Sequence, residues 1–314
     1  MPSLRIRLLS NILRLTVKRR IASVQLSSAE IHKTRARMNR LGRKAAARKS
    51  KRVNFTNTQL GGVPLCWTEP ATATKTPRPI VLHMHGGAYI VGSSEAYRPY
   101  AANLALAGDA RVAVLDYRLA PEAPYPAATE DALAAYKALL QQGVPAKRII
   151  ISGDSAGGNL ALVTLLNIKQ QRLPIPAGAV LLSPWTDLTG SGESVAFNAR
   201  QDAMLPAERI AEAAHLYAGT ANLRDWRVSP LFGDYAGLPP LNIHVGAEEI
   251  LRDDARRVTA CALEAGVSVS LREWSGAPHV FPIFADVIPE GKEAIREIAQ
   301  WINTQLPDRE AMSS

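Results

Sequence analysis

The sequence contains few of the residues that would mark a disulfide-stabilised or membrane-spanning protein. It has only two cysteines, Cys66 and Cys261, among 314 residues. Two cysteines cannot form a disulfide framework, so we interpret both as small core residues, and their number fits a reducing compartment such as the cytoplasm. There is no run of about 18 apolar residues, so the sequence predicts no transmembrane helix.

Acidic residues are nearly absent from the first 52 residues. This segment contains sixteen Lys and Arg and one acid, Glu30, whereas the rest of the chain contains 21 basic and 27 acidic residues. The formal net charge of +9 therefore comes from one end of the chain, and the remainder is mildly acidic. This distribution argues against a nucleic-acid-binding groove in the body of the protein.

The basic segment also lacks the pattern of a secretory signal, because basic residues interrupt it before a continuous hydrophobic region can form. Leu4, Leu8, Ile12 and Leu15 recur at helical spacing. Such a helix can pack on the body of the protein, which is the commoner arrangement, or lie on an anionic membrane surface. We therefore expect residues 1–52 to form part of a cap, with peripheral membrane contact as the alternative.

From residue 53 onward, short β-rich runs alternate with helical patterns, which is typical of βαβ units and a mostly parallel sheet. The predicted strands are 53–57, 63–67, 80–85, 112–116, 149–152, 179–183, 241–245 and 267–274, and the predicted helices are 127–142, 155–171, 253–265 and 290–305. Residues 188–235 interrupt the alternation and contain one helical piece, 206–217. The sequence therefore predicts an α/β core formed by residues 53–187 and 236–314, with 188–235 as a cap insertion.

The segment Gly153-Asp154-Ser155-Ala156-Gly157 lies between a strand pattern and a helical pattern. A serine in such a strand–turn–helix adopts a strained backbone that points its hydroxyl away from the sheet, and glycines on either side let strand and helix approach closely. The start of the helix adds a positive partial charge near a developing oxyanion. We predict that Ser155 is a catalytic nucleophile.

A second glycine-containing segment, residues 83–87 (HMHGG), follows an earlier predicted strand. Glycines let a loop bring backbone N–H groups against a substrate oxygen, and losing one such donor costs about 3 kcal/mol of barrier. We predict the amides of Gly86, Gly87 and Ala156 as oxyanion-hole donors, with the ring of His85 supporting the loop. The alternative is a His-x-His metal pair, but no nearby carboxylate or third histidine completes such a site, so we expect no metal.

Four motifs together resemble the hormone-sensitive-lipase-like carboxylesterases, also called bacterial family IV. His85-Gly86-Gly87-Ala88 resembles their HGGG loop, with Ala88 in place of the third glycine, and residues 116–122 (DYRLAPE), 153–159 (GDSAGGN) and 183–188 (SPWTDL) resemble three further segments. The resemblance covers about residues 60–305. It implies an α/β-hydrolase core, a mostly parallel sheet flanked by helices, a helical cap formed by two chain regions, no metal and no cofactor.

The other members of a hydrolase triad follow the nucleophile in the order Ser…Asp/Glu…His. Among the later histidines, His215 lies in the predicted cap helix and His244 within a predicted strand, whereas His279 follows the last predicted strand in a loop. A loop at that position can reach the nucleophile, and the segment resembles the His-x-Phe segment of the family. We predict that His279 is the general base.

At the acid, the sequence departs from the family pattern. The family has Asp-Pro-Leu-Arg-Asp, whereas residues 249–253 read Glu-Ile-Leu-Arg-Asp. The shared Leu-Arg-Asp places Glu249 at the acid position, and glutamate can orient an imidazole as aspartate does. Asp253 is the alternative acid, although the resemblance implies that it is a structural residue that opens a helix. Glu248 is adjacent but would point to the opposite face of a continuing strand.

These residues predict hydrolysis of short-to-medium acyl esters through an acyl-enzyme, with a lactone hydrolase or a small-molecule deacetylase as the alternative. All three triad positions are occupied, so a non-catalytic ligand-binding protein on the same fold is a remote alternative. Tyr89, Trp185 and Tyr217 are candidates for the substrate pocket, although aromatic residues are more often part of the core. An exposed edge strand would favour a homodimer, which many relatives form.

Overall fold

The structure is a computed structural model that describes residues 1–23, 25–74 and 77–306. Within these residues, eight strands form one sheet in the order β1-β2-β4-β3-β5-β6-β7-β8. The antiparallel pairs are β1 with β2 and β2 with β4, and all other neighbours are parallel. The strands are β1 (Val53–Leu60), β2 (Val63–Pro70), β3 (Ile80–Met84), β4 (Arg111–Leu115), β5 (Ile149–Asp154), β6 (Gly178–Leu182), β7 (Leu241–Gly246) and β8 (Val269–Trp274).

The sheet contains each of the strands that the sequence predicts, with ends that differ by a few residues. The strands β3, β5 and β6 are buried along their whole length, which is why they appear in the sequence as continuous apolar runs. β1 and β8 form the two edges of the sheet, and the homodimer through an edge strand stays a prediction. Residues 75–76 and the end of the predicted core, 307–314, lie outside the described residues.

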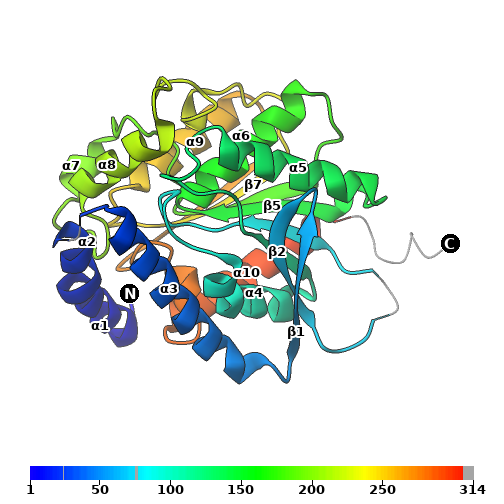
Figure 1. Cartoon of the computed structure of the whole chain (residues 1–314), viewed down its shortest axis with the longest axis horizontal. Coiled ribbons are helices and arrows are strands. Elements are labelled where there is room, and N and C mark those ends of the chain that lie inside the picture. The colour runs from blue at the N-terminus through cyan, green and yellow to red at the C-terminus, as the bar shows by residue number, and fades with distance from the viewer. Residues whose placement is uncertain (24, 75–76, 307–314) are drawn as a thin grey trace.

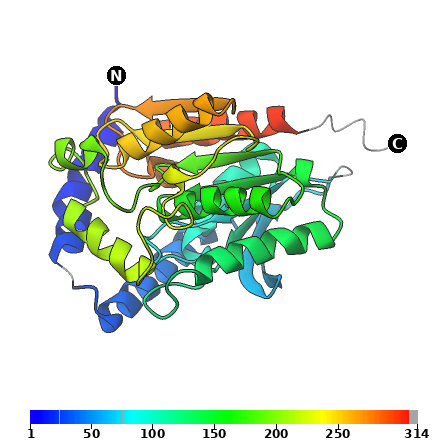
Figure 2. The same ribbon diagram turned by 90° about the horizontal axis from the view of Figure 1, so that it is seen from above.

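Helices cover both faces of the sheet (Figures 1 and 2). One face carries α4 (Ser94–Gly108) and α10 (Pro289–Gln305), and the other carries α5 (Ala127–Gln141), α6 (Ala156–Gln170) and α9 (Arg252–Glu264). A separate apolar core fills the space on each side, with Leu104 and Ile298 in one core and Leu139, Leu160 and Val258 in the other. This is the α/β-hydrolase arrangement that the sequence predicts.

The sequence analysis did not predict α4. Pro99 lies inside this helix and removes the N–H group that would bind the carbonyl of Glu95, so the local pattern argues against a helix. The helix forms because Ser93 caps it, accepting a hydrogen bond from the amide of Ala96 at 3.1 Å. Gly42 packs directly against the backbone of Glu95, where a side chain would not fit. Tertiary packing therefore overrides the proline.

The basic N-terminal segment is helical. α1 (Leu4–Leu13), a π-helical stretch (Arg14–Lys18) and α2 (Arg19–Ser23) follow one another directly, and α3 (Ser28–Ala46) comes next. Ile6 anchors α1 in a small apolar cluster that also contains Trp274, Ala277, Phe281, Ile288 and Ala294. None of the described helices is both long and apolar enough to cross a bilayer.

The insertion at residues 188–235 carries α7 (Glu193–Phe197), α8 (Ala207–Ala218) and a short 3-10 turn (Pro230–Phe232). In Figures 1 and 2, α7 and α8 lie beside the N-terminal helices at one end of the molecule. Arg209 of α8 donates a hydrogen bond of 2.9 Å to the carbonyl of Ala22 in α2. Two segments that are far apart in the sequence are thus joined side by side.

Candidate active site

The predicted catalytic residues follow neighbouring strands of the sheet. Ser155 follows β5, Glu249 follows β7 and His279 follows β8, while Ser183 follows β6 between them. The amide of Ser155 donates to the carbonyl of Leu182 at 2.9 Å, so the backbone ladder continues beyond the strand end. Because parallel strands end at the same edge of a sheet, these side chains gather at one edge.

The turn between β5 and α6 holds Ser155 in a strained conformation, with a φ of 53° and a ψ of −121°. A side chain at Gly153 would collide with the carbonyl of Gly157, and one at Gly157 would collide with that of Met84. Glycine is therefore required at both positions. Within the described part of the chain, the Ser155 hydroxyl forms no hydrogen bond, and catalytic contacts are often this loose in an enzyme without substrate.

Glu249 and His279 form a buried, hydrogen-bonded pair. Nδ1 of His279 lies 2.6 Å from Oε2 of Glu249. Burial lowers the pKa of His279, but the negative charge of Glu249 and its hydrogen bond raise it more, so the pKa lies above the ordinary value for histidine. This contact turns Nδ1 toward the acid and leaves Nε2 as the ring nitrogen that can take a proton.

Ser183 is a residue that the sequence analysis quoted in a motif without giving it a role. Its hydroxyl donates to Oε1 of Glu249 at 2.7 Å and accepts a hydrogen bond from the amide of Val280 at 3.1 Å. The amide of Gly246 also donates to Oε1 of Glu249, at 2.5 Å. Ser183 therefore connects the loop of Glu249 to the loop of His279.

The structure gives the neighbouring carboxylates other partners. Glu248 accepts a hydrogen bond from the amide of Gly276 at 2.7 Å, and Asp253 accepts one from the amide of Ser194 at 2.7 Å. Asp253 is the second residue of α9, with Leu251 at the N-cap position, so its carboxylate holds the start of α7 and does not cap its own helix. Among the described carboxylates, the one hydrogen-bonded to His279 belongs to Glu249.

The amide of Gly86 has a different partner from the predicted one. It donates to Oδ1 of Asp154 at 3.0 Å and to the hydroxyl of Tyr97 at 3.1 Å, so it already has two acceptors within the protein. The hydroxyl of Tyr97 in turn donates to the other oxygen of Asp154 at 2.7 Å. Gly86 therefore ties its loop to Asp154, the residue before Ser155, and its assignment to the oxyanion hole stays a prediction.

The next residues of the loop have free amides. The N–H groups of Gly87, Ala88 and Ala156 have no acceptor among the described residues. The φ angles are 121° at Gly87, 56° at Ala88 and 62° at Tyr89, all in the left-handed region. Successive amides in such a turn can point to the same side and form a concave site for an anion.

The two histidines of the segment 83–87, His83 at the end of β3 and His85 in the following loop, both have structural contacts. His83 binds Ser152 at 3.1 Å and Asp154 at 3.2 Å through its two ring nitrogens. Nδ1 of His85 lies 2.8 Å from the carbonyl of Gly86, and its ring stacks on Tyr117 with 4.4 Å between the ring centroids. Burial lowers the pKa of His85. No group of three or more metal-ligating side chains is found among the described residues.

The three aromatic pocket candidates are all buried. The rings of Tyr89 and Tyr217 stack with 3.6 Å between their centroids, which joins the loop after β3 to α8. Asn159 connects this stack to the third aromatic residue, because it accepts a hydrogen bond from the Tyr89 hydroxyl at 2.8 Å and donates one of 2.9 Å to the carbonyl of Trp185. Asn159 was not singled out from the sequence.

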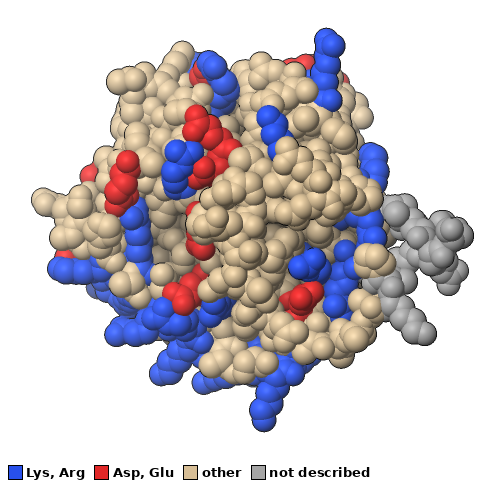
Figure 3. Space-filling model, turned by 45° about the vertical axis from the view of Figure 1, so that its right-hand side comes forward, with Lys and Arg blue, Asp and Glu red and all other residues tan. Residues whose placement is uncertain are grey.

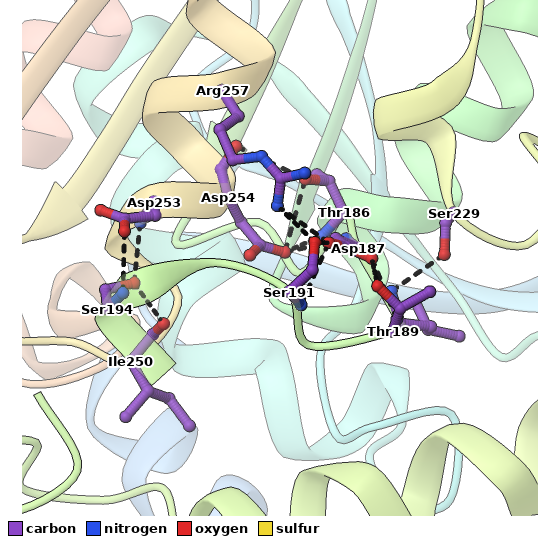
Figure 4. Close-up of polar contacts among 11 residues, drawn as sticks. Thr186, Asp187, Thr189, Ser191, Ser194, Ser229, Ile250, Asp253, Asp254 and Arg257 are labelled. Carbon is purple, nitrogen blue, oxygen red and sulfur yellow. Dashed lines mark hydrogen bonds and ion pairs between the residues drawn. The ribbon is translucent and has the colours of Figure 1, made fainter. Parts of the chain in front are cut away.

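The start of the insertion is fastened to α9, as Figure 4 shows. Oδ2 of Asp254 accepts hydrogen bonds from the amides of Thr186 at 2.6 Å and Asp187 at 2.9 Å, and Asp187 in turn binds Arg257 at 2.8 Å. Burial raises the pKa of Asp254 to about 7 in spite of the two amides. A buried carboxylate therefore holds the point at which the insertion leaves the sheet.

The middle of the insertion contacts the loop of the acid. Asn198 donates to the carbonyl of Glu249 at 2.8 Å, and Asp202 accepts a hydrogen bond from the amide of Ile250 at 2.9 Å. Lys18 of the N-terminal segment binds the carbonyl of Asp202 at 2.8 Å. The insertion thus reaches the backbone at residues 249–250, and the N-terminal segment contacts the insertion at Asp202, contacts that nothing in the local sequence indicates.

Comparisons with known proteins agree with this fold. The family model of the alpha/beta hydrolase fold matches residues 81–283. An acetyl-hydrolase from Streptomyces hygroscopicus is 40% identical over 238 residues, which are 76% of this chain and 79% of that protein. An esterase from Acinetobacter venetianus is 42% identical over 234 residues, 74% of this chain and 77% of its own.

Solved structures of similar proteins extend the likeness to nearly the whole chain. An esterase from the bacterial hormone-sensitive lipase family has a TM-score of 0.88 and 35% identity, covering 98% of this chain and 100% of its own. A hormone-sensitive lipase from a metagenome library has a TM-score of 0.87 and 37% identity, covering 96% and 99%. The chain therefore belongs to the α/β-hydrolase family and, within it, to the serine ester hydrolases of the bacterial hormone-sensitive lipase family.

Proposed function

We propose that this esterase hydrolyses short-to-medium acyl esters through an acyl-enzyme formed on Ser155, with His279 as the base and Glu249 as the acid. The observation that carries the proposal is the 2.6 Å contact between Glu249 and His279 at the sheet edge that also carries the strained Ser155. A buried histidine oriented by a carboxylate beside a serine of this conformation is the constellation of acyl transfer.

The reaction proceeds in two halves. The Ser155 oxygen attacks the ester carbonyl carbon while Nε2 of His279 takes the hydroxyl proton, which gives a tetrahedral oxyanion. The intermediate collapses, the carbon–oxygen bond to the alcohol breaks, and His279 returns the proton to the leaving alkoxide. A water molecule, deprotonated by His279, then attacks the acyl carbon. The bond from this carbon to the Ser155 oxygen breaks, His279 returns the proton to Ser155, and the carboxylic acid leaves.

The oxyanion is proposed to bind the amides of Gly87, Ala88 and Ala156. These amides have no acceptor in the described part of the chain, which supports this set, as does the engagement of Gly86 with Asp154. A structure of the enzyme phosphonylated on Ser155 tests the set directly, because the phosphoryl oxygen should lie about 3 Å from these amides. An oxygen that binds elsewhere would contradict the assignment.

Residues 1–52 and 188–235 are proposed to form a two-part cap over the sheet edge. The hydrogen bonds of Lys18 to Asp202 and of Arg209 to Ala22 support a joint unit. The stacked pair Tyr89 and Tyr217, with Trp185, is proposed to shape the acyl site beneath it.

Acetyl esters are the first substrates to test, because one similar protein is named an acetyl-hydrolase. A small-molecule deacetylase or a lactone hydrolase would use the same triad. We expect turnover of p-nitrophenyl esters to fall as the acyl chain lengthens from acetate to decanoate, and a fluorophosphonate to label Ser155. A protein that neither hydrolyses any ester of this series nor labels would be a binding protein, and the proposal would be wrong.

A further inference from the structure

The first helix of the chain has apolar residues on two opposite faces. The inner face contains Ile6 and Leu13, which are buried. On the outside, Leu4 is 82% exposed, Leu8 62%, Ile12 48% and Leu15 57%. In α1, spacings of four residues align Leu4, Leu8 and Ile12 along one stripe on the side away from Ile6 and Leu13, and Leu15 follows in the π-helical stretch directly after α1. We call Leu4, Leu8, Ile12 and Leu15 the outer stripe.

The number of exposed apolar side chains near the N-terminus is unusual within the protein. Among the described residues, nine large apolar side chains are strongly exposed, and five of them lie between residues 1 and 15. Single exposed apolar residues need no explanation, but a continuous exposed stripe on a soluble domain marks a contact surface. The packing of α1 on the body does not require the outer stripe, because that packing uses the opposite face.

Positive charges flank the outer stripe. At 100° per residue, Arg5 lies on one side of the stripe and Arg7 on the other, and Arg19 follows the π-helical stretch at the start of α2. These three arginines form no ion pair with any residue in the described ranges 1–23, 25–74 and 77–306. In Figure 3, Lys and Arg gather along the lower part of the visible face, at the height of the N-terminal helices in Figure 1.

We propose that the outer stripe of α1 docks on an anionic lipid bilayer. A helix that presents an apolar stripe bordered by arginines lies in the plane of a membrane interface, with the apolar residues inserted and the basic residues at the headgroups. The net charge of +15 in residues 1–52 complements anionic lipids. The same charge opposes a symmetric pairing of two copies through this face, because a two-fold contact would bring the two positive segments together.

The helix can dock without leaving the body of the protein. The hydroxyl and amide of Ser3 donate to the carboxylate of Glu290 at 3.0 and 2.7 Å, and Ser10 donates to the carbonyl of Gly276 at 3.0 Å. Gly276 lies three residues before His279, so a docked α1 would hold the loop of the base close to the lipid surface. If the proposed esterase function holds, amphiphilic esters in the bilayer are then the substrate class within reach; the docking itself does not depend on that function.

The test is flotation of the full chain with lipid vesicles, with hydrolysis of p-nitrophenyl acetate measured in parallel without vesicles. We expect binding to vesicles that contain about 30% phosphatidylglycerol, little binding to pure phosphatidylcholine, and loss of binding at high salt. A double variant Leu8→Gln/Ile12→Gln should bind at least about tenfold more weakly, because the inserted apolar area is reduced, with unchanged hydrolysis in solution.

The matched control is Leu263→Gln/Val287→Gln, because both side chains are equally exposed, at 55%, but lie outside the N-terminal segment. This variant should bind vesicles as the parent does. Equal binding of the parent and the outer-stripe variant would overturn the proposal, as would equal binding to neutral and anionic vesicles. If the parent does not bind but forms a dimer that the outer-stripe variant loses, the stripe is a contact between two copies and the proposal is wrong. Loss of phosphonate labelling would instead contradict the esterase function.

Discussion

Oε2 of Glu249 contacts Nδ1 of His279 at 2.6 Å, while Oε1 of the same carboxylate accepts hydrogen bonds from Ser183 and from the amide of Gly246. Both oxygens are therefore hydrogen-bonded, which opposes rotation of the Glu249 carboxylate away from the imidazole. A glutamate has one more rotatable bond than the aspartate of the family pattern, and the two contacts at Oε1 remove that added freedom. The position of the Glu249 carboxylate thus depends on Ser183, which follows β6, as well as on the loop of Glu249 itself.

The nucleophile is tested by Ser155→Ala. This change removes one hydroxyl that has no hydrogen bond among the described residues, so the melting temperature should stay close to that of the parent. Ester turnover should fall by about 10³-fold or more, because the covalent intermediate cannot form. Turnover that stays above a few per cent of the parent in a purified, folded sample would show that another residue is the nucleophile.

Replacement of Glu249 by Gln should lower kcat by about two to four orders of magnitude, because an amide neither fixes the tautomer of His279 nor stabilises the imidazolium. Glu248→Gln and Asp253→Asn are the matched controls, since each removes one negative charge within four residues. Their carboxylates bind the amides of Gly276 and Ser194, so stability should fall by about 1 kcal/mol with kcat largely kept. A large kcat loss at Asp253 with near-normal Glu249→Gln would reverse the assignment.

The pH dependence of kcat/KM reports on the same pair. Burial lowers the pKa of His279, but the charge and hydrogen bond of Glu249 prevail and raise it above its ordinary value. Only the neutral imidazole can accept the Ser155 proton, so kcat/KM should fall as the pH drops through this raised pKa, with the midpoint above about 6.5. In Glu249→Gln the residual activity should show this acid limb at lower pH. An acid limb that does not move would exclude Glu249 as the cause of the raised pKa.

Ser183→Ala tests whether the Ser183 hydroxyl positions Glu249 and His279 without taking part in the reaction itself. The change removes the hydroxyl that binds both Glu249 and the amide of Val280, so the free energy of unfolding should fall by about 1–2 kcal/mol. We expect kcat to fall by about tenfold with KM nearly unchanged, because the imidazole is held less firmly while the substrate contacts remain. Ser183→Thr, which keeps the hydroxyl, should recover part of the kcat. A variant with normal kcat would show that Gly246 alone fixes the acid.

Asp254→Asn should remove a pH dependence of stability. The pKa of Asp254 is raised from 3.8 to about 7 in the folded state. The contribution of protonated Asp254 to the free energy of unfolding is therefore present below about pH 4 and is lost as the pH rises through about 7. Asparagine resembles the protonated form and can still accept the amides of Thr186 and Asp187. The variant should therefore gain about 1–3 kcal/mol relative to the parent between pH 4 and pH 8, measured by urea unfolding. If the difference in free energy of unfolding between variant and parent stays constant from pH 4 to pH 8, the raised pKa is contradicted.

The strands of the sheet and the turn around Ser155 could be predicted because each is encoded by a local sequence pattern. The strand–turn–helix around Ser155 could be predicted from alternation and spacing, whereas the choice of Glu249 and His279 also depended on the resemblance of their segments to the family motifs. The orientation of the Gly86 amide could not, because it depends on Tyr97 and Asp154, which approach Gly86 only in the folded chain. α4 was missed because its stability comes from packing around Pro99.

Other contacts of the site carry no local pattern at all. Ser183, Asn198 and Asp202 are common polar residues in irregular segments, and only their tertiary partners distinguish them from surface residues. The interrupted alternation predicts where the insertion lies in the sequence. It does not predict that the insertion contacts the loop of Glu249.

The contacts of Asn198 and Asp202 with the backbone at residues 249–250 limit how freely this enzyme can be redesigned. Exchange of the segment 188–235 with that of a relative is an obvious way to change the accepted acyl group. Such a chimaera would also replace two of the side chains that keep the acid loop in place, so a new specificity would come with a slower enzyme. If the transplanted segment retains an amide side chain at position 198 and a carboxylate at position 202, the acyl selectivity can change without a loss of rate.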